Sequence, residues 1–307
     1  MNPLRGIGLK VLSVVVFTGM AICIKASAPH VPPGQAVFFR SFFAMPVILA
    51  WLLWAHNLRH GLDTMNPLGH FWRGLVGTSA MGLGFTALGF LPLPEATALG
   101  YAAPLLTVIF AAMFLGEQVR VFRLSAVFIG LIGVLIVLLP NLTVTSLDEA
   151  DTKLAFGAMA ALLGAVFAAL AQVFVRKLIT TEGTATIVFY FSLTASILSL
   201  FTLPFGWVVP APREALLLVS AGLLGGVGQI LLTESYRHAE TGVIAPFEYV
   251  SMVLALVFGY TLFGEIPTVP MLIGAALIVT AGLFIIWRER QLGIQRAGAR
   301  KVMTPQG

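Results

Sequence analysis

Charged side chains are scarce in this sequence, and the few that interrupt its apolar stretches are the first candidates for chemistry. Only 10% of the 307 residues are charged, while 58% are hydrophobic. A charge in apolar surroundings needs a partner or water, because desolvating it is costly. Glu248 and Glu234 could each be a carboxylate that takes up a proton in a gate or binds an amine. Alternatively, each is an interfacial carboxylate that pairs with Arg237 or reaches lipid headgroups.

Two cations, Lys25 and Arg40, lie within or near apolar stretches closer to the N-terminus. Either could bind the carboxylate of a substrate. Long cationic side chains can also extend to a membrane surface while their aliphatic stems stay buried. This second explanation requires no substrate, so both stay open.

Uncharged polar side chains supply two further pairs of candidates. Tyr101 and Tyr249 occupy matching positions of a repeated stretch, and aromatic rings facing a cavity suit an aromatic or apolar cargo. Gln172 and Gln229 are predicted to be buried amides in segments with few other polar side chains. Each of the four could bind cargo, or could instead pack and hydrogen-bond between helices.

Motifs of other chemistries are missing from the sequence. It has no Walker loop and no HExxH, CxxC or G-x-S-x-G motif, and its five histidines lack metal-ligand spacing. We therefore expect no metal, no cofactor, no nucleic-acid partner and no enzymatic activity. The one enzymatic alternative, action on lipid-linked substrates, would use a loose polar group: Arg59, His60, Asp63 and His70.

The composition indicates an integral membrane protein. Its mean hydropathy is +0.96, and it has far less charge than the ~25% of a soluble domain. About 20 mainly apolar residues cross a bilayer as a helix. Proline, glycine and charge divide the sequence into ten such spans, near residues 7–26, 36–55, 70–90, 95–115, 121–140, 154–176, 185–204, 214–236, 243–263 and 268–287. We predict an all-α integral membrane fold of ten transmembrane helices.

Lysine and arginine predict the orientation, because they stay on the cytoplasmic side. With a cytoplasmic N-terminus, the outer loops contain only Lys153 and Arg213, and the inner segments contain the other loop cations. Both termini are then inside, as in a multi-pass protein of the bacterial inner membrane. The net charge of +5 follows from this topology and needs no acidic partner. The sequence leaves the oligomeric state open.

One stretch of the sequence occurs twice. Residues 95–117 and 243–265 align without gaps, and each is an apolar helix that ends in Gly-Glu. The identities are Tyr101/Tyr249, Leu106/Leu254, Phe110/Phe258, Gly116/Gly264 and Glu117/Glu265, with Leu75/Leu223 and Gly77/Gly225 upstream. The sequence therefore predicts two halves of one design.

Five spans is an odd number, so the second half must be inverted relative to the first. Loop charges agree, because GEQVRVFR (116–123) is basic whereas its counterpart GEIPTVP (264–270) contains no arginine. We predict a first five-helix repeat over residues 1–141 and a periplasmic linker over 142–153. The inverted repeat then covers residues 154–290, and residues 291–307 form a disordered, basic cytoplasmic tail.

The repeats resemble the drug/metabolite transporter superfamily, specifically its EamA type. The resembling segments are AVFFRSFF (36–43), AAPLLTVIFAAMFLGE (102–117), LFGE (262–265) and IGAALIVTAGLFI (273–285). The general pattern is similar to bacterial exporters of aromatic and other amino acids of the YddG type. In span 9, Met252 replaces the proline that the first half has as Pro104, and Pro246 lies earlier, so the bend of this span stays open.

The resemblance implies a secondary transporter that exports small organic metabolites by alternating access, through a central cavity lined by spans 1, 3, 4, 6, 8 and 9. An inverted repeat supports the same mechanism, because two similar halves can exchange conformations around one site. We therefore expect an exporter of amino acids or related metabolites, either proton-driven or facilitative. Drugs, purines or vitamins are the alternative cargo on the same scaffold.

Overall fold

The computed structural model describes residues 3–54, 62–115, 121–142, 149–178, 181–239 and 244–302. Every regular element within these residues is a helix, which confirms the predicted all-α class. The helices are α1 (Pro3–Ser27), α2 (Pro33–Phe42), α3 (Ala44–Trp54), α4 (Pro67–Phe90), α5 (Leu93–Gly100), α6 (Ala102–Leu115), α7 (Val121–Leu142), α8 (Glu149–Leu178), α9 (Thr184–Leu200), α10 (Pro212–His238), the 3-10 helix η1 (Ala245–Tyr249), α12 (Val250–Phe263) and α13 (Val269–Val302).

Eight helical segments of the described residues are long and apolar enough to cross a membrane. They are Leu4–Ser27, Pro33–Trp54, Leu93–Phe114, Val121–Pro140, Asp151–Val175, Pro212–Ser235, Pro246–Phe263 and Val269–Arg288. The shorter apolar helix α9 lies among them, and so does α4, which has 24 residues but contains His70 and Arg73. Together these helices account for each of the ten predicted spans.

Helix ends follow from residue chemistry. Proline occupies the first turn of α2, α4, α10 and η1, where its missing N–H breaks no hydrogen bond. Asn66 caps α4, because its side chain accepts a hydrogen bond from the Gly69 N–H. Gly264 ends α12 with φ of 65°, a left-handed conformation that glycine adopts without steric cost.

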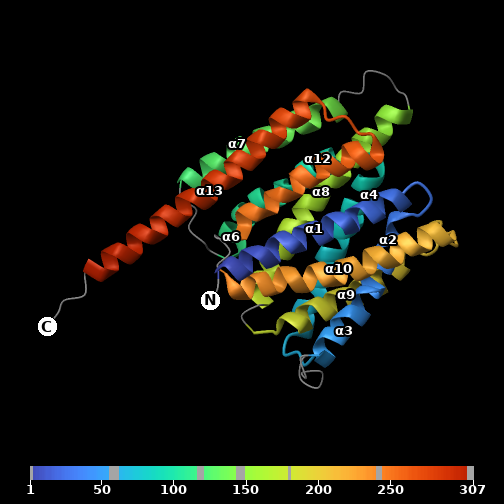
Figure 1. The fold of residues 1–307 in the computed structure, drawn as a ribbon, viewed down its shortest axis with the longest axis horizontal. Coiled ribbons are helices and arrows are strands. Elements are labelled where there is room, and N and C mark those ends of the chain that lie inside the picture. The colour runs from blue at the N-terminus through green and yellow to red at the C-terminus, as the bar shows by residue number, and fades with distance from the viewer. Residues whose placement is uncertain are drawn as a thin grey trace.

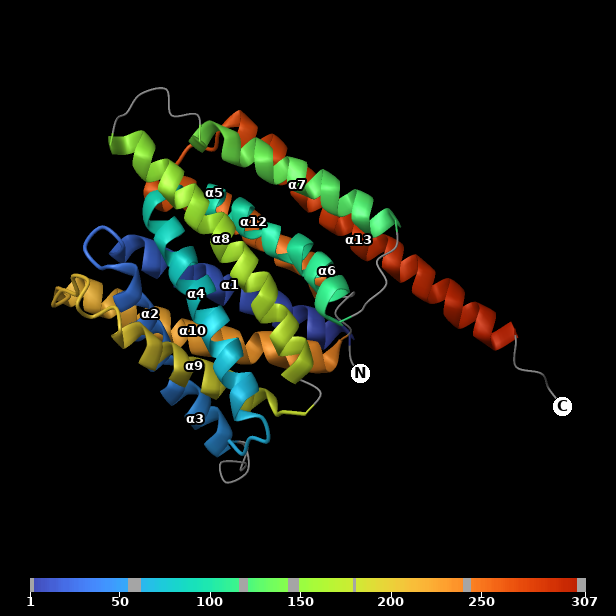
Figure 2. The ribbon, with the colours of Figure 1, turned by 180° about the vertical axis from the view of Figure 1, so that it is seen from behind.

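The helices pair in a pattern that respects the internal repeat. The most extensive contacts join α1 to α10, α4 to α8, and α7 to α13, while α2 packs on α9 (Figures 1 and 2). The repeat makes α1 equivalent to α8 and α4 equivalent to α10, so the first two contacts are copies of each other. The other two pairs each join a helix to its own equivalent. This is the two-fold symmetry expected of an inverted duplication.

Both chain termini lie at the same end of the bundle (Figure 1). We call this end the terminal face and the other end the opposite face. Five helical crossings separate the start of α1 from the end of α7, so the second half begins at the opposite face. This placement agrees with the predicted inversion.

Three predicted spans are interrupted. The second span breaks at Phe43, between α2 and α3, and the fourth breaks at Tyr101, between α5 and α6. Pro46 and Pro104 follow these breaks by three residues, and neither can donate the N–H that a continuous helix needs there. The ninth changes from η1 to α12 at Tyr249 although Met252 replaces the later proline. The sequence analysis did not predict the first two interruptions, and the bend that it left open in the ninth span is present.

The polar ends of two helices extend further than the sequence suggested. The helix α13 continues to Val302, so the expectation of a disordered tail from residue 291 is wrong for its described part. The segment RERQLGIQRAGARKV (288–302) is rich in residues that favour helix and contains no proline. Similarly, α8 begins at Glu149, within the segment predicted to be linker.

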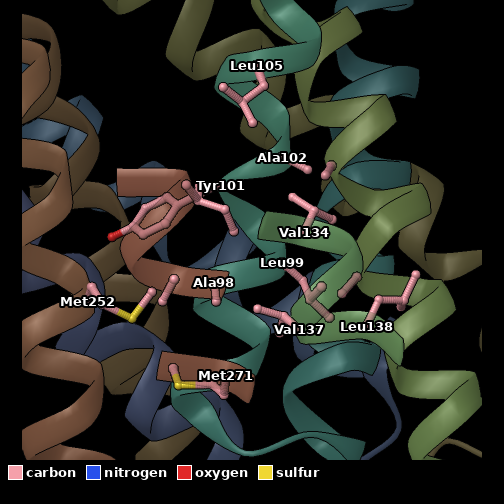
Figure 3. Packing of buried hydrophobic residues seen from close by; sticks show 14 of the residues in the cluster. Ala98, Leu99, Tyr101, Ala102, Leu105, Val134, Val137, Leu138, Met252 and Met271 are labelled. Atoms are coloured by element: carbon pink, nitrogen blue, oxygen red, sulfur yellow. The ribbon is translucent and has the colours of Figure 1, made fainter. Parts of the chain in front are cut away.

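A buried cluster joins the two halves near the helix breaks (Figure 3). Leu99, Leu105 and Val137 come from the first half, and Met252 and Met271 come from the second. Tyr101 belongs to the same cluster and is 6% exposed. The interrupted helices α5, α6 and α12 are thus held by apolar packing across the repeat boundary.

Candidate functional site

The two repeated tyrosines meet where their helices are interrupted. Their ring centroids are 5.1 Å apart and their planes form an angle of 69°. Their backbones are almost identical, with φ and ψ of −69° and −4° at Tyr101 and −68° and −9° at Tyr249. The two tyrosines that the internal repeat matches in the sequence are therefore also in contact in the structure, with the same local backbone conformation.

The tyrosine hydroxyls are directed at protein groups. The Tyr101 hydroxyl lies in hydrogen-bond contact with the Ser251 hydroxyl, and it donates to the Glu248 carbonyl oxygen at 3.3 Å. The Tyr249 hydroxyl lies against Gly282 of α13, where an added Cβ would be only 1.6 Å from it. The pair thus packs the junction of the two halves, and its predicted contact with cargo stays a prediction.

Glu248 forms an ion pair that the sequence did not predict. Its partner is Lys10 of α1, whose Nζ donates to Oε2 of Glu248. The Lys10 side chain is 2% exposed, whereas that of Glu248 is 49% exposed. Lys10 lies seven residues into α1, about 10 Å along the helix, which is about a third of a ~30 Å hydrocarbon core. We call this pair the terminal-face latch.

Hydrogen bonds connect the terminal-face latch to the tyrosine pair. The Glu248 carbonyl oxygen accepts hydrogen bonds from the hydroxyls of Ser251, at 2.7 Å, and Tyr101. These donors satisfy a carbonyl at the change from 3-10 to α-helix, where backbone groups otherwise lose their partners. A carboxylate, a buried ammonium and two hydroxyls therefore share one junction between α1, the end of α5, η1 and the start of α12.

A second ion pair joins the other end of α1 to the end of α12. The Nζ of Lys25 lies 2.9 Å from Oε1 of Glu265, and it also donates to the carbonyl oxygens of Leu88 and Leu91, at 3.2 and 2.6 Å. Oε2 of Glu265 accepts from the Leu93 N–H at 2.8 Å, at the start of α5. The side chains of Lys25 and Glu265 are 12% and 14% exposed. We call this pair the opposite-face latch.

The remaining predicted site residues are dispersed. Gln172 is exposed on α8, so the prediction of a buried amide was wrong there; Gln229 of α10 is half-buried. Glu234 is half-buried at the end of α10, where His238 follows one turn later with Nδ1 4.0 Å from its carboxylate. Arg40 is buried inside the bundle at 5% exposure, so it does not extend to a surface.

A polar cluster on the terminal face links the halves outside the spans. Oε1 of Glu182 accepts from the Thr64 hydroxyl and from the N–H groups of Met65 and Asn66, at 2.9 to 3.0 Å. His70 Nε2 lies 3.6 Å from the other Glu182 oxygen. Burial raises the pKa of Glu182, but these hydrogen bonds outweigh it and hold its pKa below the ordinary value.

The same cluster removes support from the enzymatic alternative. His70 is 2% exposed and stacks on Tyr190 with ring centroids 5.0 Å apart, so it is closed to a substrate. Arg59 and His60 lie outside the described residues, and Asp63 makes contacts of its own. Within the part of the chain that the structure describes, no three potential metal ligands come together.

Sequence reasoning missed the roles of two buried residues, Lys10 and Arg73, and of Glu265, whose side chain is 14% exposed. Lys10 was placed among cytoplasmic cations, Arg73 likewise, and Glu265 was interpreted as a helix-end residue. A signal existed for Lys10, because it lies inside the apolar stretch of α1 and not in its flank. For Arg73 the signal was the six glycines of its helix, which let neighbouring side chains approach closely.

Comparison with known proteins agrees with this architecture. The model of the EamA-like transporter family matches residues 4–139 and again residues 155–287. A solved crystal structure has the same fold with a TM-score of 0.65 at 23% identity, covering 94% of this chain and 98% of the other. The two matches to one family model correspond to the two halves of the bundle.

Two curated relatives cover nearly the whole chain. An S-adenosylmethionine uptake transporter of Rickettsia bellii (strain RML369-C) is 27% identical over 286 residues, 93% of this chain and 94% of the relative. A pseudopaline exporter of Pseudomonas aeruginosa (strain UCBPP-PA14) is 29% identical over 281 residues, 90% and 94% of the two chains. With both halves matched, the protein belongs to the EamA-like transporter family, and these relatives are transporters of small molecules.

Proposed function

We propose that this protein exports amino acids or related small metabolites across a bacterial inner membrane by alternating access. The observation that carries the proposal is the pair of ionic latches at the two ends of α1. Each joins the first half of the protein to η1 or α12 of the second. The relatives named for S-adenosylmethionine uptake and pseudopaline export support small organic cargo.

The two latches could open and close the two faces of the transport pathway in turn. They are fifteen residues apart on α1, about 22 Å along the helix, so they can close the two faces of one pathway separately. Both ion pairs are formed in this structure, and we assign it to the occluded state of the proposed cycle. Opening one while the other stays closed would expose the interior to one side at a time.

The terminal-face latch also offers a route for proton coupling. Glu248 is half-exposed and can exchange a proton with water, whereas Lys10 is enclosed. A proton on Glu248 removes the negative charge that holds Lys10, and this weakens the contact between α1 and η1. With both termini cytoplasmic, as the lysine and arginine distribution supports, proton uptake from the cytoplasm would favour an inward-open state.

The test is flux into proteoliposomes that contain the purified protein. A panel of amino acids is measured with and without a pH gradient, together with a drug, a purine and a vitamin as competitors. We expect saturable amino-acid flux that the other compounds inhibit weakly. Flux no higher than in empty vesicles for every compound would reject the proposal, and preferred transport of a competitor would reject the amino-acid cargo.

Uptake is the second candidate direction, because one curated relative is named an uptake transporter. Vesicles of defined orientation separate the two. Inside-out vesicles that accumulate cargo when acidified inside would support proton-driven export. Accumulation confined to right-side-out vesicles would support uptake.

A further inference from the structure

Two arginines inside the bundle have no carboxylate partner in the part of the chain that the structure describes. Arg40 of α2 and Arg73 of α4 are 5% and 8% exposed. The Arg40 Nε and the Arg73 Nε and Nη1 have no hydrogen-bond partner among the described residues. Among the residues that the structure describes, neither guanidinium forms an ion pair with Asp or Glu. Buried polar groups are normally paired, so each of these atoms requires an explanation.

The two guanidinium groups converge on one ring. The Cζ of Arg73 lies 3.6 Å from the centroid of Phe191 on α9, and the Cζ of Arg40 lies 5.7 Å from the same centroid. A cation over an aromatic face is attracted to the ring, but the ring accepts none of the N–H donors, which lie in the guanidinium plane. The pair is therefore attracted to Phe191, while three of its nitrogens still lack an acceptor among the described residues.

Glycines of the two repeats make room for these groups. A Cβ at Gly77 would lie 2.8 Å from Arg73 Nη1, and a Cβ at Gly225 would lie 3.0 Å from Arg40 Nε. Gly77 and Gly225 are equivalent positions of the internal repeat. The site thus uses α2 and α4 of the first half and α9 and α10 of the second, and it lies at their interface.

Two like charges in a buried position are unfavourable unless an anion joins them. A carboxylate fits this need, because its two oxygens accept the paired N–H groups of a guanidinium. Arg40 lies seven residues, about 10 Å along the helix, from the start of α2. A lipid headgroup at the surface would not reach the enclosed guanidinium, whereas a small cargo inside the bundle would.

We propose that Arg40 and Arg73 form an anion site that binds the carboxylate of the transported metabolite. This proposal rests on the proposed transport function and narrows its cargo to compounds with a carboxylate. The two arginines belong to opposite ends of the first half, since α2 starts at the opposite face and α4 at the terminal face. A cargo carboxylate between them would therefore join α2 to α4, beside Phe191 of the second half.

Binding is tested on purified protein in nanodiscs by thermal shift and calorimetry, independently of transport. Phenylalanine is compared with phenylalaninamide and phenethylamine, which lack the carboxylate, in the wild type and in the variants Arg40→Met and Arg73→Met. We expect the wild type to bind phenylalanine at least tenfold more tightly than either analogue. Each variant should lose this preference, and Arg73→Lys should retain part of it.

Stability of the empty protein is the second readout, with exposed Arg213→Met as the matched control. Removing an unpaired buried charge should raise the melting temperature of Arg40→Met and Arg73→Met, whereas the control should leave both melting and binding unchanged. A structural cation predicts the reverse, namely lower melting temperatures with the acid preference retained.

Three results would overturn the carboxylate site. They are equal wild-type binding of the acid and its amide, unchanged preference in both methionine variants, and chloride or sulfate binding that phenylalanine does not compete away. Proteoliposome flux separates this failure from that of the proposed function. If the wild type transports the amide and amine as well as the acid, transport stands and the anion site falls.

Discussion

The two latches of α1 differ in how many partners support each ion pair. Lys25 at the opposite face has a carboxylate and two carbonyl oxygens, and its partner Glu265 also caps α5 through the Leu93 N–H. Lys10 at the terminal face depends on Glu248 within the described residues, and Glu248 is half-exposed. One latch is a network, and the other is a single bond.

This difference indicates which face opens more easily. At the opposite face, the loss of one interaction leaves the others in place. At the terminal face, the ion pair is lost when one proton or one cargo charge neutralises Glu248. We therefore expect the terminal face to open more readily than the opposite face. The predictions below follow from this asymmetry, from the largest expected effect to the smallest.

The change Glu248→Ala should have the largest effect on stability. It leaves the buried Lys10 ammonium without a partner, and breaking a buried ion pair on one side costs about 3 kcal/mol, the low end of the usual range. Thermal unfolding in detergent measures the loss. By contrast, Lys10→Met should cost clearly less, because the remaining Glu248 is half-exposed and stays hydrated. Equal losses in the two variants would contradict the single-bond description.

The double variant Lys10→Met/Glu248→Gln sharpens this comparison. Replacing a whole buried ion pair by neutral groups is often neutral for stability, so we expect recovery towards the wild-type melting temperature. Flux should nevertheless lose its dependence on the pH gradient, because the titratable carboxylate is gone. A double variant with wild-type pH dependence would exclude Glu248 as the coupling group.

At the opposite face, Glu265→Ala should cost about 1–3 kcal/mol, the penalty for leaving one buried donor, the Leu93 N–H, unpaired. Lys25 keeps its bonds to the Leu88 and Leu91 carbonyls, which limits the loss. The exposed pair Glu149 and Lys153 is the matched control, because Glu149→Ala should not change the melting temperature measurably. A loss for Glu265→Ala above that of Glu248→Ala would show that the remaining bonds of Lys25 do not limit the loss at the opposite face.

The smallest effect concerns pH and the cluster around Glu182. Its pKa is depressed in the folded protein, so its contribution is present above the unfolded pKa of about 4.3 and is lost as pH falls through the lower folded pKa. Glu182→Gln should therefore lower stability at neutral pH and flatten the loss of stability between about pH 5 and 3. Melting curves across that range measure this change. If Glu182→Gln and the wild type lose stability equally as the pH falls, Glu182 does not titrate in this way.

Sequence reasoning identified the architecture because its signals are regular. Apolar length gives the spans, and the offset between Tyr101 and Tyr249 gives the inverted repeat. The orientation from lysine and arginine stays a prediction. The breaks at Tyr101 and Phe43 were not predicted, although Pro104 and Pro46 signal them. The break at Tyr249 has no such local signal, and it shows that an equivalent position can keep its geometry without the proline.

The site was harder to predict, because ion pairs between distant residues leave no periodic pattern. Lys10 and Glu248 are 238 positions apart in the chain, and single-residue arguments could only state that Glu248 needs a partner. Lys25 and Arg40 were treated as alike, although one forms a complete ion-pair network and the other has no carboxylate partner among the described residues. Only the helix packing separates a structural cation from a candidate binding cation.

Alternating use of the two latches is tested most directly by crosslinking each one. In a background with Cys23, the sole cysteine, replaced by alanine, cysteines are placed at residues 10 and 248 or at residues 25 and 265. Each pair is joined by a reducible bifunctional reagent, and cargo flux is measured before and after reduction. We predict that either crosslink abolishes flux and that reduction restores it. Continued flux through protein crosslinked at either end would contradict the account.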